Sequence, residues 1–324
     1  NDYPEVFWIN TNYKYKITSV SNNNQKKILE MGMYITRNSY VGDSNIIKNT
    51  YIPDLNSKIE EIVESGKNNG KTNFEKLEYI YSLIKCNSRY IQGKSKNNVY
   101  NVLCNKNGTC TGFSRSLKFI CDEMGIPCVV ARGTVGNSNE KHMWNIVKLN
   151  GQWFICDITN ELENTSSINK FFAIADNGEY KQEIPTSYLN KTMNFRYPAV
   201  SNNEGIFNAR YYADNNKDVF KLYGYDDEKL YNHYISYGLK EGRRCSPVYD
   251  PVYYYNKYAD LQKVFGDDYT KLYNHFMIYG MKEGRQASDI FDIKEYKNQN
   301  SEIVGLFGDG LERYYGYFSQ HSNL

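Results

Sequence analysis

Three residues that could carry out acyl-transfer chemistry occur in order within about fifty positions: Cys110, His142 and Asp157. A cysteine thiolate can attack a carbonyl carbon. A histidine can take the thiol proton and return it to a leaving group, and an aspartate can hold the imidazole in the required tautomer. Their types and order predict a thiol nucleophile with a histidine base, provided that the fold brings the three side chains together.

Cys110 is expected in the first turn of a helix. Gly108 precedes it, and the helix is predicted to end at Gly125, two residues before Pro127. At a helix N-terminus, unpaired N–H groups and the helix dipole favour a negative charge, which increases the thiolate fraction. Burial as a small apolar side chain is the alternative for this position. The helix is predicted from apolar residues at helical spacing, namely Phe113, Leu117, Ile120, Cys121 and Met124.

His142 and Asp157 are expected on two paired strands. The segments 142–149 and 152–157 are rich in Trp, Phe, Ile and Val, and they flank Asn150-Gly151, the dipeptide that most favours a type I′ hairpin turn. This turn places both residues on one face as diagonal neighbours, about 7 Å apart at the backbone. A slip of one residue would send them to opposite faces. The predicted pairs are Leu149 with Gln152, Val147 with Phe154, Asn145 with Cys156 and Trp144 with Asp157.

Three segments carry a family resemblance, namely Gly108-Thr109-Cys110-Thr111-Gly112-Phe113-Ser114, His142-Met143-Trp144-Asn145 and Asp157-Ile158-Thr159. They resemble the motif blocks of the transglutaminase-like superfamily, in particular its secreted bacterial branch, which is related to kyphoscoliosis-type peptidases. The resemblance is specific from about residue 73 to residue 176. It implies an α+β, papain-like thiol fold in which a nucleophile helix packs on an antiparallel sheet, with Cys110, His142 and Asp157 as the catalytic triad.

The resemblance also implies a second donor that stabilises the oxyanion together with the N–H of the cysteine. In the family this donor is an aromatic or amide side chain upstream of the nucleophile. Tyr100 and Gln92 are candidates, and the spacing does not select between them. Trp144, expected on the same face as His142, is a further candidate for a subsite. We expect no cofactor, and no metal site either, since the cysteines form no CxxC pair.

Length and composition bound the class of protein. The chain has 324 residues, of which 40% are hydrophobic and 23% charged, so a globular fold with room for two domains is expected. The net charge of +2 and the lack of a basic face argue against nucleic-acid binding. No run of about 20 apolar residues predicts a transmembrane segment. Seven cysteines leave at least one thiol free if the others pair, and Cys110 is the candidate.

The first two regions of the chain are expected to form the enzyme. Residues 1–54 are interpreted as a strand-rich segment packed on the core, and residues 55–203 as the transglutaminase-like catalytic domain. Two helices with capping-box sequences are predicted to start at Ser57 and Thr72. A solvated loop from Gly66 to Gly70 is expected between them.

Residues 204–324 are interpreted as an all-α domain of tandem repeats. The segment 230–243 recurs as the segment 272–285, at an offset of 42 residues. Each repeat is predicted to form a hairpin of two short helices that stacks on its neighbours. The tyrosines are expected to pack between repeats, and a groove for cell-wall glycan or peptidoglycan is the alternative. The three repeats span about 207–248, 249–290 and 291–324.

Two classes of function follow. The first is a cysteine-dependent acyltransferase that acts on glutamine side chains or peptide carbonyls of a protein or peptide substrate through a thioester. An amine would resolve the thioester into a cross-link of surface proteins or wall components, whereas water would make the same triad a peptidase or amidase. The second is a non-catalytic cell-wall binding or scaffold protein that works through its repeats. The resemblance and the composition favour a secreted or cell-surface protein of a Gram-positive bacterium.

Overall fold

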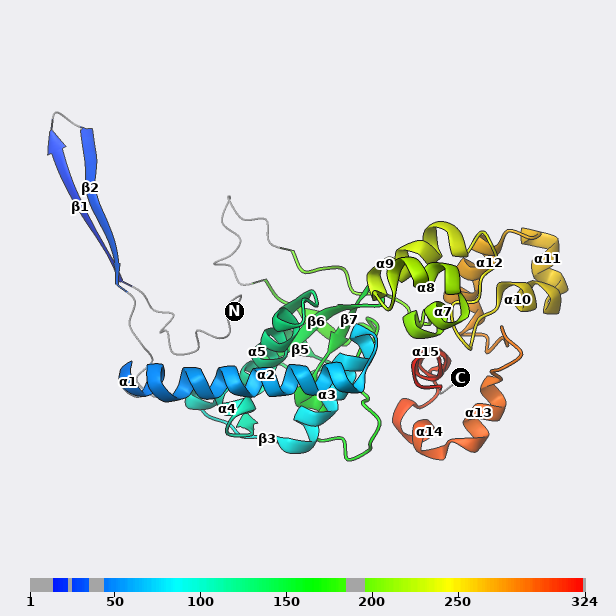
Figure 1. Cartoon of the computed structure of the whole chain (residues 1–324), viewed down its shortest axis with the longest axis horizontal. Coiled ribbons are helices and arrows are strands. Elements are labelled where there is room, and N and C mark those ends of the chain that lie inside the picture. The colour runs from blue at the N-terminus through cyan, green and yellow to red at the C-terminus, as the bar shows by residue number, and fades with distance from the viewer. Residues whose placement is uncertain (1–13, 23–24, 35–43, 185–195, 323–324) are drawn as a thin grey trace.

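The computed structural model describes residues 14–22, 25–34, 44–184 and 196–322 (Figure 1). Strands β1 (Lys14–Asn22) and β2 (Gln25–Tyr34) pair with each other in antiparallel orientation. Figure 1 shows this hairpin standing away from the helices of the core. The packing of the whole segment 1–54 on the core stays a prediction.

Two long helices, α2 and α3, form one layer of the core. The first of them begins before Ser57 and continues past Gly66, so the predicted start and the predicted loop are both wrong. A helical segment leads directly into α2, and only a short connection separates α2 from α3. The elements of this part are α1 (Ser44–Ile46), the π-helical turn η3 (Ile47–Tyr51), α2 (Ile52–Asn69) and α3 (Asn73–Asn87).

The two errors have different causes. The helix starts early because the chain is already helical through α1 and η3, with Tyr51 in the right-handed helical conformation. It continues through Gly66 because a Cβ at that position would lie 2.5 Å from Cδ1 of Ile80, so the glycine allows α3 to approach closely. The capping box at Thr72 is confirmed, since its hydroxyl accepts the N–H of Glu75 at 3.3 Å and its own N–H donates to the Glu75 carboxylate at 3.2 Å.

A four-stranded antiparallel sheet, in the order β7-β6-β5-β8, completes the core. Helix α5 (Cys110–Glu123) packs against β5 and β6, and its buried residues share one apolar cluster with those of α2 and α3. The core therefore has the expected mixed architecture of a nucleophile helix on an antiparallel sheet. The strands are β5 (Cys128–Val135), β6 (His142–Leu149), β7 (Gln152–Cys156) and β8 (Tyr180–Gln182).

Short elements surround the N-terminus of α5. The two-residue strands β3 and β4 pair in parallel, which places Tyr90 beside Gly108. A 3-10 turn and a short helix lie between these strands in sequence, and one further helix follows β7. These elements are β3 (Arg89–Tyr90), η4 (Lys94–Lys96), α4 (Val99–Leu103), β4 (Asn107–Gly108) and α6 (Ile158–Glu161).

The C-terminal region is helical, and in Figure 1 it lies at the end of the core opposite the hairpin. The bounds of its helices recur at an offset of 42 residues, with three helices in each set instead of the predicted two. The chain leaves the helical conformation at Tyr258, between the first and second helix of the middle set. The sets are α7 (Ala209–Asn215), α8 (Lys217–Tyr223) and α9 (Asp227–His233); α10 (Pro251–Lys257), α11 (Ala259–Phe265) and α12 (Tyr269–His275); and α13 (Ile293–Gln299), α14 (Ser301–Phe307) and α15 (Leu311–His321).

Many tyrosines of this region form its core. In the first two sets, π-helical turns, η6 (Tyr234–Gly238) and η7 (Phe276–Gly280), extend α9 and α12. The division of the chain into regions 1–54, 55–203 and 204–324 stays a prediction, and α2 crosses the first boundary. The tyrosines that form the core of the C-terminal region have side chains that are 0% exposed; they include Tyr212, Tyr234, Tyr249, Tyr254, Tyr314 and Tyr315.

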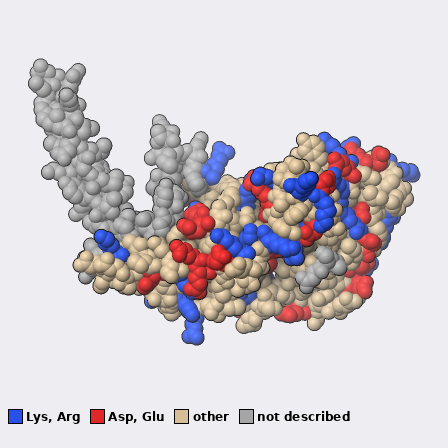
Figure 2. Space-filling model, in the orientation of Figure 1, with Lys and Arg blue, Asp and Glu red and all other residues tan. Residues whose placement is uncertain are grey.

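The surface drawn in Figure 2 carries both signs of charge. Lysine and arginine residues are interspersed with aspartate and glutamate residues over the core and the C-terminal helices. Among the helices that the structure describes, none is both long enough and apolar enough to span a bilayer.

Candidate active site

Cys110 is the first residue of α5, as predicted, and the preceding loop holds this turn in place. The N-cap residue Thr109 donates its N–H to the carbonyl of Lys96 at 3.2 Å and its hydroxyl to Oδ1 of Asn97 at 2.6 Å. Gly112 faces the same carbonyl, and a Cβ there would lie 2.7 Å from the Lys96 oxygen. The glycine two residues after Cys110 is therefore needed for this close backbone approach.

The thiol of Cys110 and the imidazole of His142 are close enough for each to shift the pKa of the other. Burial raises the pKa of the thiol, but the hydrogen bond and charge of His142, with the backbone N–H groups of Met143 and Thr111, outweigh it and lower the pKa overall. Burial also lowers the pKa of His142, but the hydrogen bonds to Asp157 and Cys110 reverse this and raise the pKa to about 9. The two opposite shifts favour a thiolate beside an imidazolium.

The hairpin of β6 and β7 brings the histidine to the aspartate. Its turn residues Asn150 and Gly151 have φ angles of 47° and 75°, as a type I′ turn requires. Nε2 of His142 lies 2.8 Å from Oδ2 of Asp157, so Nδ1 is left for the thiol. The predicted register is confirmed by the pairs Asn145 with Cys156, Val147 with Phe154 and Leu149 with Gln152.

The carboxylate of Asp157 is fully buried and held by several donors. The hydroxyl of Tyr180 donates to Oδ2 at 3.1 Å, and the N–H of Asn160 donates to Oδ1 at 3.1 Å, so Asp157 also caps α6. Its own N–H donates to the carbonyl of Phe171 at 2.9 Å. A buried carboxylate needs such donors. They fix its oxygens in place beside the imidazole.

Residues 60–158 match the family model described as the transglutaminase-like superfamily. This part of the core is therefore similar to that family. The matched segment contains Cys110, His142 and Asp157 and ends one residue after the aspartate.

Two solved structures are similar to parts of the chain. One, described as a TGase, has 16% sequence identity and a TM-score of 0.32, and the similarity covers 44% of this chain and 44% of that one. The other, described as a "Putative Cysteine Protease from Cytophaga hutchinsonii", has 18% identity and a TM-score of 0.29, covering 47% of this chain and 65% of that one. The chain thus spans less than two thirds of either structure. No curated protein matches it.

Trp144 does not line a subsite of the transglutaminase-like core. Its side chain is 0% exposed, stacks on the ring of His142 with centroids 6.1 Å apart, and meets Tyr180 edge-on at 5.1 Å. Trp144 shares the face of His142, as expected, but its side chain is buried in an apolar cluster with Ile174 and Tyr180 and so leaves no surface for a subsite. Its ring stacks on the imidazole of His142 and is too deeply buried to touch a substrate.

The two upstream oxyanion candidates have different surroundings. The hydroxyl of Tyr100, on α4, donates to the carboxylate of Asp54 at 3.2 Å, and its ring packs on Tyr51, which assigns Tyr100 to the packing of α4 on α2. Gln92 is exposed and follows Ile91, whose N–H donates to the carbonyl of Gly108 at 2.9 Å. Gln92 therefore lies on the segment that runs beside the nucleophile turn.

Tyr90 is the residue near the nucleophile that the sequence analysis missed. It pairs with Gly108, two residues before Cys110, and its side chain is 44% exposed. Burial and then the negative charge of Cys110 raise the pKa of its hydroxyl, which keeps the hydroxyl protonated and able to donate. The parallel pairing that brings Tyr90 here joins strands of two residues each, too short to leave a periodic pattern.

The other six cysteines are less suited than Cys110 to nucleophilic chemistry. All seven cysteines lie in the described part of the chain, and none forms a disulfide. Burial raises the pKa of Cys104 to about 11 and that of Cys245 to about 11, so both stay thiols near neutral pH. Cys86 is exposed. No three His, Cys, Asp or Glu side chains within the described ranges come together to hold a metal ion.

Proposed function

We propose that this protein is a transglutaminase-type acyltransferase in which Cys110 is the nucleophile, His142 the general base and acid, and Asp157 the residue that orients the imidazole. The observation that carries the proposal is the position of Cys110 at the N-terminus of α5, beside an imidazole that is hydrogen-bonded to the buried carboxylate of Asp157. A place in the branch related to kyphoscoliosis-type peptidases is part of the same proposal and rests on the sequence motifs.

The reaction would run in two displacements. The Cys110 thiolate attacks the carboxamide carbon of a glutamine side chain, and the imidazolium of His142 gives its proton to the departing ammonia, which leaves a thioester. A primary amine then loses a proton to the imidazole as it attacks the thioester carbon. The isopeptide is released, and the thiolate and the imidazolium are restored.

The oxyanion would be stabilised by the backbone N–H of Cys110, which lies among the unpaired donors at the start of α5. Tyr90 is the candidate for the second donor, because its hydroxyl stays protonated and its backbone pairs with Gly108, two residues before Cys110. Gln92 lies two residues further along the same segment and is the alternative.

A peptidase or amidase would use the same side chains with water in place of the amine. Amine transfer and hydrolysis can be distinguished by incubating the protein with a glutamine-containing acceptor protein and a fluorescent primary amine. Incorporation of the amine supports the acyltransferase. Release of peptides or of ammonia without incorporation would assign hydrolysis.

The decisive control is removal of the Cys110 thiol by mutation. We expect iodoacetamide to label Cys110 in preference to the buried cysteines and to the half-buried Cys104, whose pKa is raised to about 11, and a Cys86→Ala background removes the exposed thiol. Amine incorporation should persist in Cys86→Ala and disappear in Cys86→Ala with Cys110→Ala. Retention of the activity in the double variant would overturn the proposal. Absence of both activities from the wild-type protein would favour the non-catalytic scaffold.

The proposals of cell-wall glycan or peptidoglycan binding by residues 204–324, and of a secreted or cell-surface location in a Gram-positive bacterium, still rest on the sequence alone. The buried tyrosines of that region favour packing between helices over a sugar groove.

A further inference from the structure

Four positions recur in each helical set of the C-terminal region and form one face per set. We call these faces 1, 2 and 3. Each consists of an apolar residue and a neighbouring ring on the second helix, and of two rings at or just beyond the third helix. Face 1 is Leu222, Tyr223, His233 and Tyr237; face 2 is Val264, Phe265, His275 and Tyr279; face 3 is Leu306, Phe307, Tyr317 and His321.

The three rings of each face are in contact. In face 1, the ring centroids of Tyr223 and Tyr237 lie 6.1 and 5.5 Å from that of His233. The corresponding distances are 5.7 and 5.6 Å in face 2, and 5.4 and 4.0 Å in face 3. The same local structure is therefore built three times from one sequence pattern.

The faces differ in what covers them. In face 1, Leu222 is 71% exposed and Tyr237 is 60% exposed; in face 2, Val264 is 70% exposed and Tyr279 is 56% exposed. Nine of the twelve exposed large apolar side chains in the described ranges lie from residue 220 to residue 290, and none lies beyond. Exposed apolar side chains that gather in this way mark interaction surfaces.

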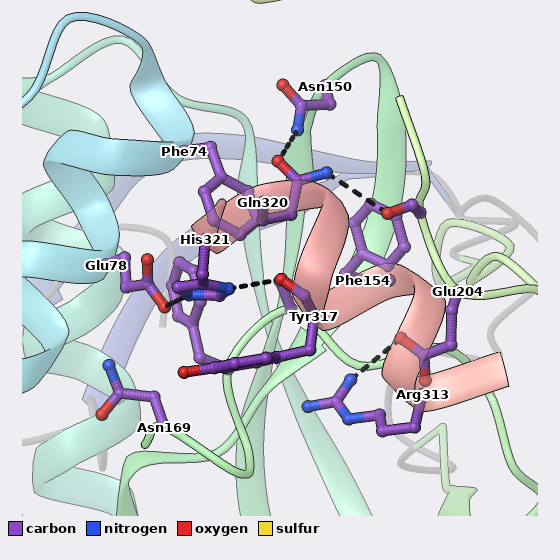
Figure 3. A pocket seen from close by; sticks show the side chains of 14 residues that line it. Phe74, Glu78, Asn150, Phe154, Asn169, Glu204, Arg313, Tyr317, Gln320 and His321 are labelled. Carbon is purple, nitrogen blue, oxygen red and sulfur yellow. Dashed lines mark hydrogen bonds and ion pairs between the residues drawn. The ribbon is translucent and has the colours of Figure 1, made fainter. Parts of the chain in front are cut away.

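Face 3 is docked on the core of the same molecule (Figure 3). His321 donates from Nε2 to the carboxylate of Glu78 at 2.8 Å, and its ring lies edge-on to Phe74 at 6.4 Å. Both partners belong to α3. Beside them, Arg313 of α15 pairs with Glu204 at 2.9 Å. A protein surface is therefore what this kind of face binds when its partner is present.

The fit between face 3 and the core is close. A small cavity of about 30 Å³ remains between Phe74, Asn169 and Tyr317, which is enough for water. The oxygen of the Asn169 side chain has no partner among the described residues, which a water would supply. Tyr317 and His321 thus pack directly on α3, while hollows of about 350 Å³ and 570 Å³ lie beside the docked face.

Faces 1 and 2 present the same chemistry to solvent. Tyr237 and Tyr279 occupy the position of His321, and a phenol hydroxyl can donate to a carboxylate as an imidazole N–H does. Each face also has an ion pair next to it, Arg243 with Asp218 at 2.8 Å and Arg285 with Asp260 at 2.9 Å, as in the polar rim of an interface. A glycan would leave the aliphatic side chains of Leu222 and Val264 without a matching apolar surface.

We propose that faces 1 and 2 are docking sites for a protein partner that presents an aromatic ring next to a carboxylate on a helix, as α3 presents Phe74 and Glu78 to face 3. This goes beyond the proposed catalytic function and does not depend on it. The partner would be held at two sites whose positions in the repeats are equivalent, so a partner with two such helices would bind more tightly than either site alone allows.

The test uses the full chain with labelled leucine and valine methyl groups and, as probe, a stapled helical peptide with the sequence of residues 70–85. The staple is needed because a free peptide of this length is only partly helical. We expect saturable shifts of the Leu222 and Val264 methyl signals. Tyr237→Ser with Tyr279→Ser should weaken binding at least tenfold, with an unchanged circular dichroism spectrum because both side chains are exposed.

A peptide that carries Phe74→Ala and Glu78→Gln is the matched control and should give no shift. Three results would overturn the proposal: no shift with the parent peptide at millimolar concentration, equal shifts with the control peptide, or shifts of the same methyl groups by an N-acetylglucosamine hexamer in place of the peptide. The last result would assign the faces to glycan.

Discussion

The imidazole of His142 lies 2.8 Å from the carboxylate of Asp157, although fifteen residues separate them in sequence. The turn at Asn150-Gly151 creates this contact by folding β7 back on β6 in a fixed register. Burial alone would lower the pKa of His142, but the hydrogen bond to Asp157 raises it to about 9. One local turn thus determines the protonation state of a residue eight positions away.

The first prediction concerns the pH dependence of the thiol. Because the pKa of Cys110 is lowered, its rate of alkylation by iodoacetamide should fall only as the pH drops below the range in which an ordinary cysteine, with a pKa of about 8.5, loses reactivity. The measurement is the rate against pH in the Cys86→Ala background, with a cysteine-containing peptide as reference. A midpoint equal to or above that of the peptide would contradict the thiolate–imidazolium pair.

The second prediction is for Asp157→Asn. This change removes the charge that stabilises the imidazolium and allows the wrong tautomer, so kcat should fall by roughly 10²- to 10⁴-fold. The alkylation midpoint of Cys110 should rise at the same time, since a neutral His142 no longer stabilises the thiolate. A loss of activity without any change in the alkylation profile would assign Asp157 a structural role only.

The third prediction separates the hydrogen bond of the Tyr180 hydroxyl from the packing of the Tyr180 ring. Tyr180→Phe keeps the ring against Trp144 but removes the hydroxyl that donates to Oδ2 of Asp157. A hydrogen bond to a charged group contributes about 1.5–3 kcal/mol, so kcat/KM should fall about tenfold or somewhat more. The thermal midpoint should also fall, by a few degrees, because the same hydrogen bond satisfies a buried carboxylate in the folded protein. Unaltered kinetics in this variant would show that the other donors suffice to hold the carboxylate.

The hairpin could be predicted from the sequence because all of its determinants are local. Asn150-Gly151 permits two consecutive positive φ angles, and apolar strand residues lie on both sides of it. The start of α5 was predictable for the same reason, since Gly108 and Gly125 bracket an apolar pattern at helical spacing. The proposed catalytic residues lie on these local elements, which explains why their positions agree with the pattern.

Two other positions could not be predicted because distant contacts determine them. Gly66 was interpreted as a helix end, but its missing Cβ makes room for Ile80 of the neighbouring helix, and sequence alone does not distinguish the two uses of glycine. Tyr90 reaches the nucleophile through a parallel pairing with Gly108, which nothing in the local pattern around either residue indicates. The helix break at Tyr258 was missed because neither glycine nor proline marks it in the sequence.

The fourth prediction tests the backbone contact under the nucleophile. Gly112→Ala would place a Cβ 2.7 Å from the carbonyl oxygen of Lys96, so we expect a loss of about 1–3 kcal/mol in stability and a reduced activity as the first turn of α5 shifts. Gly305→Ala in α14 is the matched control, since a Cβ there meets nothing within 4 Å. That change should stabilise by up to about 1 kcal/mol. Equal unfolding midpoints for the two variants would contradict the close approach.

The fifth prediction concerns the contact that docks α15 on the core. Nδ1 of His321 faces the carbonyl of Tyr317 at 2.7 Å and Nε2 faces Glu78 at 2.8 Å, so both nitrogens must carry protons to satisfy both acceptors. Burial lowers the pKa of His321, but the charge of Glu78 outweighs it and raises the pKa above its usual value, while Arg313 opposes the increase.

The sign of the pH effect follows from this raised pKa. The stabilisation by His321 should be fully present below the unfolded-state pKa of about 6.5 and should be lost as the pH rises through the higher folded-state pKa. His321→Gln should therefore cost about 2 kcal/mol at pH 6 and much less at pH 10. Amide hydrogen exchange in α15, compared between the two proteins at both pH values after correction for the intrinsic rate, measures this difference. An equal difference at both pH values would show that His321 contributes through packing on Tyr317 and Phe74 and not through its charge.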